Sequence, residues 1–270
     1  MQQNELYDVI ILGASDAGIA LCEQIKSKSP ESKVALVSKH FNFIKQPDKL
    51  ADTKLILGES VLSSYNHGLI ILSLKNRQLV VGKNLVIATG GKAIKVPKEQ
   101  FKNNKIYYKP FDIPNAAKTK PAVVYGNGTD AVNYAITMSK KFKYVYLCSD
   151  IFKLACDNKL IKKLNNIANI VHLPNCHIIA CKNDRDGNIC EISLDTYDTI
   201  KCTVLVLALG RLPDVSGIDL KMIELDNAGF IKINAGYQTT RVPNIYAIGE
   251  CTKHNVKKGI TIVCNHILGR

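Results

Sequence analysis

The chain has 270 residues, 46% of them hydrophobic and 22% charged, which is enough to bury a sizeable core and favours two globular domains. No apolar run approaches the roughly 20 residues of a membrane-spanning helix, so we expect no membrane segment. The formal net charge of +13 comes from lysines scattered along the chain, and no basic stretch alternates with aromatic residues, which argues against a nucleic-acid partner.

Two interpretations of the basic excess stay open. The lysines either form a solvated surface or attract an acidic partner or the phosphates of a nucleotide. The nine cysteines mostly fall in apolar runs, and none has C-x-x-C spacing. We therefore expect reduced, mostly buried thiols and no metal site. The first expected strand begins within a few residues of Met1 and leaves no room for a signal peptide, so the expected location is cytoplasmic.

The chain opens with an apolar strand, residues 7–12, which leads into the glycine turn Gly13-Ala14-Ser15-Asp16-Ala17-Gly18 and then a helix over 19–26. This order is typical of a dinucleotide site, because the turn lets the backbone approach a pyrophosphate and the helix N-terminus offers free N–H groups. Ser15 stands where the G-x-G-x-x-G fingerprint has its second glycine.

A second parallel strand is expected over residues 33–37 and ends in Ser38-Lys39, where dinucleotide folds usually carry Asp or Glu for the ribose. A loop follows over 41–52. Alternating apolar residues then predict a small antiparallel meander over 55–62, 69–74 and 78–81. A buried strand ends in the turn Ala88-Thr89-Gly90.

The proline-containing segment 101–120 suits a crossing between domains, and the strand-turn-helix plan then repeats. A strand at 123–125 leads into Gly126-Asn127-Gly128-Thr129-Asp130-Ala131 and a helix over 130–142. Two such turns about 110 residues apart strengthen the dinucleotide interpretation, although each alone is compatible with a tight turn that binds nothing. The next strand, 144–148, ends in Ser149-Asp150.

The rest of the chain alternates strands and helices. We expect a basic helix over 159–167 and a final helix over 258–268. Strands are expected around 170–172, 177–181, 188–194, 201–209 (leading to Gly210), 230–233 and 239–250.

Three motifs, in order along the chain, carry a family resemblance: Ala-Thr-Gly at 88–90, Ala-Leu-Gly-Arg-x-Pro at 208–213 and Thr-x-x-Pro-Asn-Ile-Tyr-Ala-Ile-Gly-Glu at 240–250. With the two glycine turns, the chain resembles two-domain flavoproteins of the thioredoxin reductase type. These belong to the pyridine nucleotide-disulfide oxidoreductases and include ferredoxin/flavodoxin–NADP reductases. The resemblance implies an α/β fold of two Rossmann-like dinucleotide-binding domains, the second inserted in the first, each with a small antiparallel meander.

The resemblance also implies domain boundaries and site residues. The FAD domain would be residues 1–112 completed by 237–270, and the NAD(P) domain 113–236. On the FAD side the candidate cofactor-binding residues are Gly13, Ser15, Asp16, Ala17, Gly18, Ser38, Lys39, Ala88, Thr89, Gly90, Gly249, Glu250, Lys257, Lys258 and Gly259. On the nicotinamide side they are Gly126, Gly128, Thr129, Asp130, Ser149, Asp150 and Gly210.

The departures from the family pattern shape the functional expectation. Tyr108 and Phe111 occupy the positions of the thioredoxin reductase C-x-x-C pair, so no thiol–disulfide relay is expected there. Asp150 stands where NADPH-binding relatives have basic residues. A carboxylate favours ribose hydroxyls and repels a 2′-phosphate, so NADH is expected rather than NADPH.

The sequence thus predicts an NAD(P)H-dependent FAD oxidoreductase without a redox-active disulfide. Electrons would pass from nicotinamide through flavin to a small acidic redox protein, such as a ferredoxin or flavodoxin, or to a diffusible acceptor. No catalytic side chain is named, because the flavin carries the hydride chemistry. A homodimer is compatible with the sequence. The alternative is a degenerate member that has lost its flavin and acts as a non-enzymatic nucleotide-binding or scaffold protein, suggested by Ser15, Ser38 and a short segment after Ser38.

Overall fold

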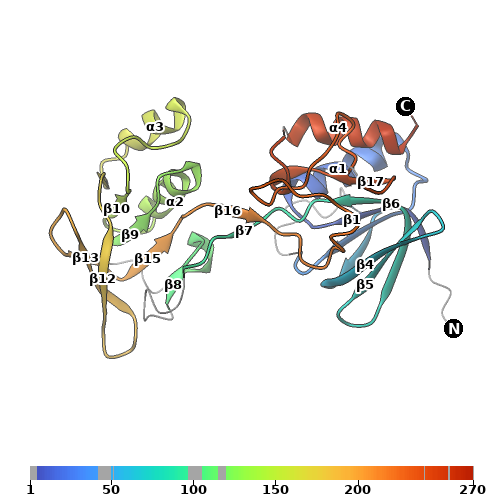
Figure 1. Ribbon diagram of the computed structural model, residues 1–270. Helices are drawn as coiled ribbons and strands as arrows, with labels where there is room; N and C mark the ends of the chain where they lie inside the picture. The colour runs from blue at the N-terminus through green and yellow to red at the C-terminus, as the bar shows by residue number, and fades with distance from the viewer. Residues whose placement is uncertain are drawn as a thin grey trace. The chain divides into compact units, whose positions relative to one another are not determined.

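The computed structural model describes residues 5–41, 50, 52–96, 105–114, 120–239, 241–254 and 256–269. The chain forms two compact units (Figure 1). The first unit comprises Met1–Lys92 and Leu212–Arg270, and the second, Ala93–Arg211, is inserted between them. The predicted domains divided at 112/113 and 236/237, whereas the second compact unit begins 20 residues and ends 25 residues earlier. Which cofactor each unit binds stays a prediction.

The first unit is built on a seven-stranded sheet with the order β3-β2-β1-β6-β5-β4, in which β17 also pairs with β6. The strands β1, β2, β3, β6 and β17 are mutually parallel, whereas β4, β5 and β6 form the antiparallel meander. Their bounds are β1 (Leu6–Leu12), β2 (Val34–Ser38), β3 (Lys54–Leu57), β4 (Ser60–Asn66), β5 (Leu69–Leu74), β6 (Leu79–Ile87) and β17 (Ile245–Ala247).

Helices α1 (Asp16–Lys28) and α4 (Val256–Ile267) lie side by side on one face of this sheet (Figure 1). Leu21 and Ile25 of α1 and Val263 of α4 pack there against Val9 and Ile11 of β1. The opposite face is covered by a largely irregular segment whose apolar residues pack beneath the meander: Ile218, Met222, Ile223 and Ile231. A short 3₁₀ helix, η4 (Gly249–Cys251), follows β17.

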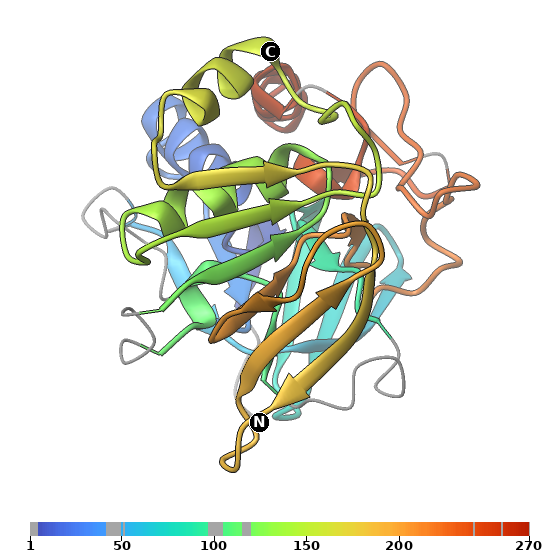
Figure 2. The ribbon, with the colours of Figure 1, turned by 90° about the vertical axis from the view of Figure 1, so that its left-hand side faces the viewer.

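The second unit has a five-stranded parallel sheet with the order β11-β10-β9-β15-β8. Helices α2 (Thr129–Ser139) and α3 (Asn158–Asn165) pack on one face, and the antiparallel sheet β12-β13-β14 packs on the other (Figures 1 and 2). The strand bounds are β8 (Ile106–Tyr107), β9 (Ala122–Tyr125), β10 (Val145–Cys148), β11 (Ile170–Leu173), β12 (Ile178–Asn183), β13 (Ile189–Leu194), β14 (Ile200–Lys201) and β15 (Val204–Leu207).

Two short strands carry the chain between the units. β7 (Gly91–Ala93) and β16 (Arg211–Pro213) pair as a two-stranded sheet. The predicted crossing at 101–120 is therefore displaced: residues 106–107 form β8, an edge strand of the second unit, and η2 (Pro110–Asp112) is a 3₁₀ turn.

The predicted α/β fold, with a meander in each unit and the second unit inserted in the first, is confirmed. The expected strand 55–62 is two strands broken at Gly58-Glu59, and the expected strand 230–233 is reduced to isolated bridges at Ile231 and Ile233. Most of the expected loop 41–52 lies outside the described residues. No helix in the described part of the chain is long and apolar enough to cross a membrane.

Candidate functional site

The glycine turn after β1 is shaped by a close backbone approach to the end of β6. Gly13 has φ +113°, and a Cβ there would lie 2.3 Å from the carbonyl oxygen of Ala88. A Cβ on Gly18 would lie 2.2 Å from the carbonyl oxygen of Gly13. Only glycine fits either position without moving the backbone. The predicted turn therefore forms, and helix α1 starts directly against the end of β6.

Ser15 has a structural role that its place in the fingerprint did not reveal. It is the N-cap of α1, where its Oγ accepts a hydrogen bond from the Gly18 N–H (3.3 Å) and donates one to the Ala88 carbonyl (2.8 Å). Glycine could make neither bond. Serine thus ties the turn to β6, and its hydroxyl proton is not available to a ligand.

Three predicted FAD segments converge at this turn. Gly249, with φ +85°, would carry its Cβ 3.3 Å from the Ala17 Cβ, and Oε2 of Glu250 lies 3.8 Å from where a Cβ on Gly90 would be. Beside Gly90, the Thr89 Oγ1 is buried and has no hydrogen-bond partner among the described residues. The turn, the end of β6 and the segment after β17 therefore form one cradle with an unsatisfied hydroxyl beside it.

Ser38 and Lys39 stand at the end of β2, but their side chains are engaged locally. The Ser38 Oγ donates to the His40 carbonyl (2.8 Å) and accepts from the His40 N–H (3.3 Å). Lys39 forms an ion pair with Glu59 (2.8 Å), and this contact lowers the pKa of the Glu59 carboxyl. Their expected contact with a ribose stays a prediction, and it would require these local bonds to be shared or exchanged.

Lys257, Lys258 and Gly259 lie in the first turn of α4 as predicted, with both lysines exposed. Gly259 is needed for packing, because a Cβ there would come within 2.5 Å of the Tyr237 ring. Tyr237 is buried with φ +59°, and its ring meets His254 edge-on at 5.9 Å between centroids. This tyrosine was not among the predicted residues, and only the tertiary packing identifies it.

The second glycine turn repeats the geometry of the first with one difference. Gly126 has φ +150°, and a Cβ there would lie 2.2 Å from the Ala208 carbonyl oxygen. Gly128 is the N-cap of α2, makes no side-chain cap and has open space where a Cβ would stand. The start of α2, with Thr129 and Asp130, therefore lacks the side-chain cap that Ser15 gives α1 and has open space at its N-cap.

Asp150 lies at this second turn, as the end of the second strand should. The exposed carboxylate accepts a hydrogen bond at Oδ1 from the Asn127 side-chain amide (2.8 Å). Asn127 also uses its carbonyl to accept the Ala155 N–H (2.7 Å), and Gly128 bridges to Ala155. Asn127 was not among the predicted site residues, although its place between two turn glycines was a usable signal.

Ser149 and Gly210 are placed differently from the prediction. Ser149 is fully buried: its Oγ donates to the Ile151 carbonyl (2.8 Å) and lies 2.9 Å from Nε2 of His172, whose pKa is lowered by burial. Gly210 accepts the Ile94 N–H (3.0 Å) and belongs to the segment that leaves the second unit. The cofactor contacts expected of these two residues stay predictions.

All nine cysteines are free thiols. Burial raises the pKa of Cys22, Cys202 and Cys251 to about 12 and also raises that of Cys176, whose thiol donates to the Leu173 carbonyl (3.2 Å). Such thiols are poor nucleophiles at neutral pH. Within the described ranges, no three metal-binding side chains are grouped as a metal site would require.

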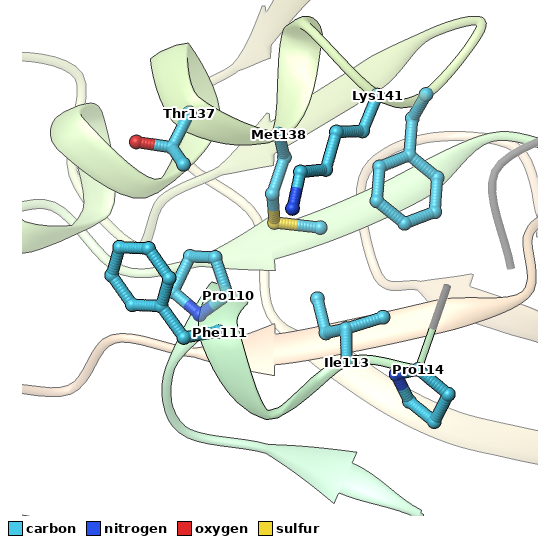
Figure 3. Close-up of a pocket in the computed structure, with 8 residues that line it drawn as sticks. Pro110, Phe111, Ile113, Pro114, Thr137, Met138 and Lys141 are labelled. Carbon is cyan, nitrogen blue, oxygen red and sulfur yellow. The ribbon is translucent and has the colours of Figure 1, made fainter. Parts of the chain in front are cut away.

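The positions of the missing dithiol, Tyr108 and Phe111, lie in the second unit. The Tyr108 hydroxyl accepts the Val96 N–H (3.3 Å), while Phe111 is 76% exposed. Phe111 lines a small apolar pocket between η2 and α2, opposite Met138 (Figure 3). Neither of these two positions carries a thiol.

Comparison with known proteins places these features in a family. The family described as pyridine nucleotide-disulphide oxidoreductase matches residues 7–263. An NADH dehydrogenase of Ferdinandcohnia aciditolerans is 26% identical over 70% of this chain and 37% of its own length. A ferredoxin–NADP reductase of Orientia tsutsugamushi is 23% identical over 78% of this chain and 66% of its own length. The chain thus spans from about a third to two thirds of these relatives.

The fold comparison agrees. The crystal structure of T. acidophilum thioredoxin reductase matches with a TM-score of 0.83 at 19% identity, covering 97% of each chain. At that identity the likeness concerns the fold. The predicted resemblance to flavoproteins with the thioredoxin reductase fold is therefore confirmed.

The two glycines of the second turn give a matched pair of variants. We expect Gly126→Ala to lower the free energy of unfolding by at least about 2 kcal/mol, since φ is unfavourable and the methyl group collides with the Ala208 carbonyl. Gly128→Ala should leave the melting temperature within about 2 °C of the parent, because that position is open and has φ −93°.

The Gly128→Ala variant also tests whether a dinucleotide occupies the open space beside Gly128. Gly128→Ala should weaken NADH binding, measured by calorimetry, at least about fivefold, because the methyl group would occupy the approach to the helix N-terminus. Unchanged NADH affinity in Gly128→Ala would mean that no dinucleotide lies against this turn.

Proposed function

The chain belongs to the pyridine nucleotide-disulphide oxidoreductase family, and from this premise we propose that it is an NAD(P)H-dependent flavoprotein oxidoreductase without a redox-active disulfide. The observation that carries the proposal is the pair of strand–turn–helix sites, one in each unit, each closed around a glycine that no other residue can replace. Two dinucleotides bound by one chain are what a hydride transfer from nicotinamide to flavin requires.

The residues of the first unit fit an FAD dinucleotide. The Gly13–Gly18 turn brings backbone N–H groups of α1 to a cradle completed by Gly249, and the buried Thr89 hydroxyl beside it lacks a partner among the described residues. When bound, the flavin would accept a hydride from nicotinamide and release electrons to an acceptor. The protein's part is to bind and orient. No side-chain acid or base is assigned, because the hydride passes between two bound cofactors.

The proposed electron acceptor is inferred from the absence of cysteines at the dithiol positions and from the net charge of the chain. Tyr108 and Phe111 stand at the dithiol positions, so the electrons leave by a route other than that disulfide. A net charge of +13 suits a small acidic redox protein, and a ferredoxin–NADP reductase is among the relatives. The cytoplasmic location and a homodimer stay predictions.

The nicotinamide substrate is proposed to be NADH. Asp150 is exposed and lies at the second glycine turn, held there by Asn127. A carboxylate at this place accepts the ribose hydroxyls of NADH and repels the 2′-phosphate of NADPH.

One observation favours the alternative, a family member that binds nucleotides without flavin chemistry. Asp16 is exposed in the first turn of α1, where a pyrophosphate would lie. Ser15 and Ser38 are both engaged in local hydrogen bonds. This alternative keeps the nucleotide site of the second unit and gives up the FAD.

A flavin titration separates the two functions. The purified protein should be yellow or take up added FAD with sub-micromolar affinity, and NADH should bleach the flavin absorbance under anaerobic conditions. ADP and AMP serve as controls for binding through the adenosine half alone. A colourless protein that binds NADH but not added FAD would contradict the proposed oxidoreductase activity and support the alternative.

Cofactor preference tests the role given to Asp150. We expect kcat/KM for NADH to exceed that for NADPH at least about tenfold, or roughly 1.4 kcal/mol. Asp150→Arg should narrow or reverse the ratio, because a guanidinium binds a 2′-phosphate. Equal kinetics with both nucleotides in the parent protein would show that Asp150 does not face the ribose.

Asp16 offers a gain of affinity. Its carboxylate repels a pyrophosphate at the start of α1, so Asp16→Asn should tighten FAD binding about fivefold, or about 1 kcal/mol, while helix stability falls slightly. Glu23→Gln is the matched control, since it removes the same charge about 10 Å farther along α1. Equal effects of both variants would trace the change to net charge instead of local repulsion.

A further inference from the structure

Asn127 links the second glycine turn to the segment that follows β10. Its side-chain amide donates to Oδ1 of Asp150 (2.8 Å), and its own carbonyl accepts the N–H of Ala155 (2.7 Å). The next residue, Gly128, bridges to the same Ala155. One residue of the turn therefore holds both ends of the segment 150–155.

The start of that segment is also held by hydrogen bonds of the buried Ser149. The Ser149 Oγ donates to the Ile151 carbonyl, so its contact with Nε2 of His172 (2.9 Å) has the histidine as donor. Ser149 is fully buried, and Leu154 near the other end is 6% exposed and packs in the core of the unit. Asp150 is thus an exposed residue between two anchored ones, with its carboxylate turned to Asn127.

The way Asn127 holds the carboxylate matters chemically. A neutral amide positions Asp150 without cancelling its negative charge, which a lysine or arginine would do. Among the described residues, Oδ2 of Asp150 accepts no hydrogen bond and remains open to a ligand donor. A fixed, uncompensated carboxylate can accept ribose hydroxyls and opposes a phosphate at the same place.

We propose that Asn127 is a positioning residue that sets the preference of the second unit for an unphosphorylated adenosine ribose by holding Asp150 at the glycine turn. The inference deepens the proposed function and rests on its nucleotide site, but not on the flavin. Without Asn127, the Asp150 side chain rotates into solvent, the hydroxyls lose a preorganised acceptor, and a 2′-phosphate meets less repulsion.

The test uses the full chain and two probes that carry the adenosine half alone, ADP-ribose and 2′-phospho-ADP-ribose, with dissociation constants measured by calorimetry. The parent should prefer ADP-ribose at least about tenfold, and Asn127→Ala should reduce that preference to about threefold or less, as expected for a lost charge-assisted bond. Asn133→Ala, which removes an exposed asparagine from α2, should leave the preference unchanged.

A double-mutant cycle decides whether Asn127 acts through Asp150. In an Asp150→Ala background, adding Asn127→Ala should change neither dissociation constant by more than about twofold. Asn127→Ser, whose hydroxyl is too short to reach the carboxylate, should repeat the loss of preference and serves if the alanine variant does not fold.

Three results would overturn the inference: equal weakening of both probes by Asn127→Ala, a full effect of Asn127→Ala without Asp150, or no binding of ADP-ribose to the parent protein. The flavin experiment is independent. A protein that takes up no FAD but shows the expected selectivity would refute the oxidoreductase and leave the role of Asn127 standing.

Discussion

The structure depends on one steric constraint that occurs twice: a strand end so close to a glycine turn that its carbonyl oxygen occupies the place of a Cβ. Ala88 imposes this on Gly13, and Ala208 imposes it on Gly126, at 2.3 and 2.2 Å. Each alanine is the first residue of a motif that carries the family resemblance, Ala-Thr-Gly or Ala-Leu-Gly. In each unit, the alanine of the motif therefore contacts the glycine of the turn. This contact brings the end of one strand next to the start of the helix.

The two turns diverge at the next position. Ser15 fills the space with a hydroxyl that caps α1 and bonds the Ala88 carbonyl, whereas Gly128 leaves the start of α2 uncapped and open. The first turn gains stability from its own side chain and relies on the neighbouring segments Thr89-Gly90 and Gly249-Glu250 for any further contact with a cofactor. The second turn has no such side-chain bond, and the space at its N-cap is open.

The sequence predicted the strands, turns and helices that form these contacts, because an apolar run followed by a glycine turn is compatible with few other local structures. It did not predict the residues at which the two compact units divide. The two-residue strand β8 shows no periodicity, yet its pairing with β15 places residues 106–107 in the second unit. Ile218 and Met222 pack under the sheet of the first unit, which moves the second boundary from 236/237 to 211/212.

Side-chain partners were beyond the sequence for a different reason: they depend on rotamers and on contacts between distant segments. Ser38 was expected at a ribose but bonds the backbone of His40, and Ser149 bonds Ile151 and lies against His172. Ser38 ends β2 and Ser149 follows β10, and each hydroxyl bonds the backbone carbonyl two residues further on, which is a common use of serine at a turn.

The placement of acidic residues gives the two sites opposite characters. Asp16, in the first turn of α1, interacts favourably with the helix dipole and so competes with a phosphate for the same positive potential. Asp150 follows β10 and is not part of α2, and its carboxylate accepts a hydrogen bond from Asn127. Under the proposed function, an aspartate would therefore oppose anion binding in the first unit and favour ribose hydroxyls in the second, depending on whether it lies in the first turn of a helix or after a strand.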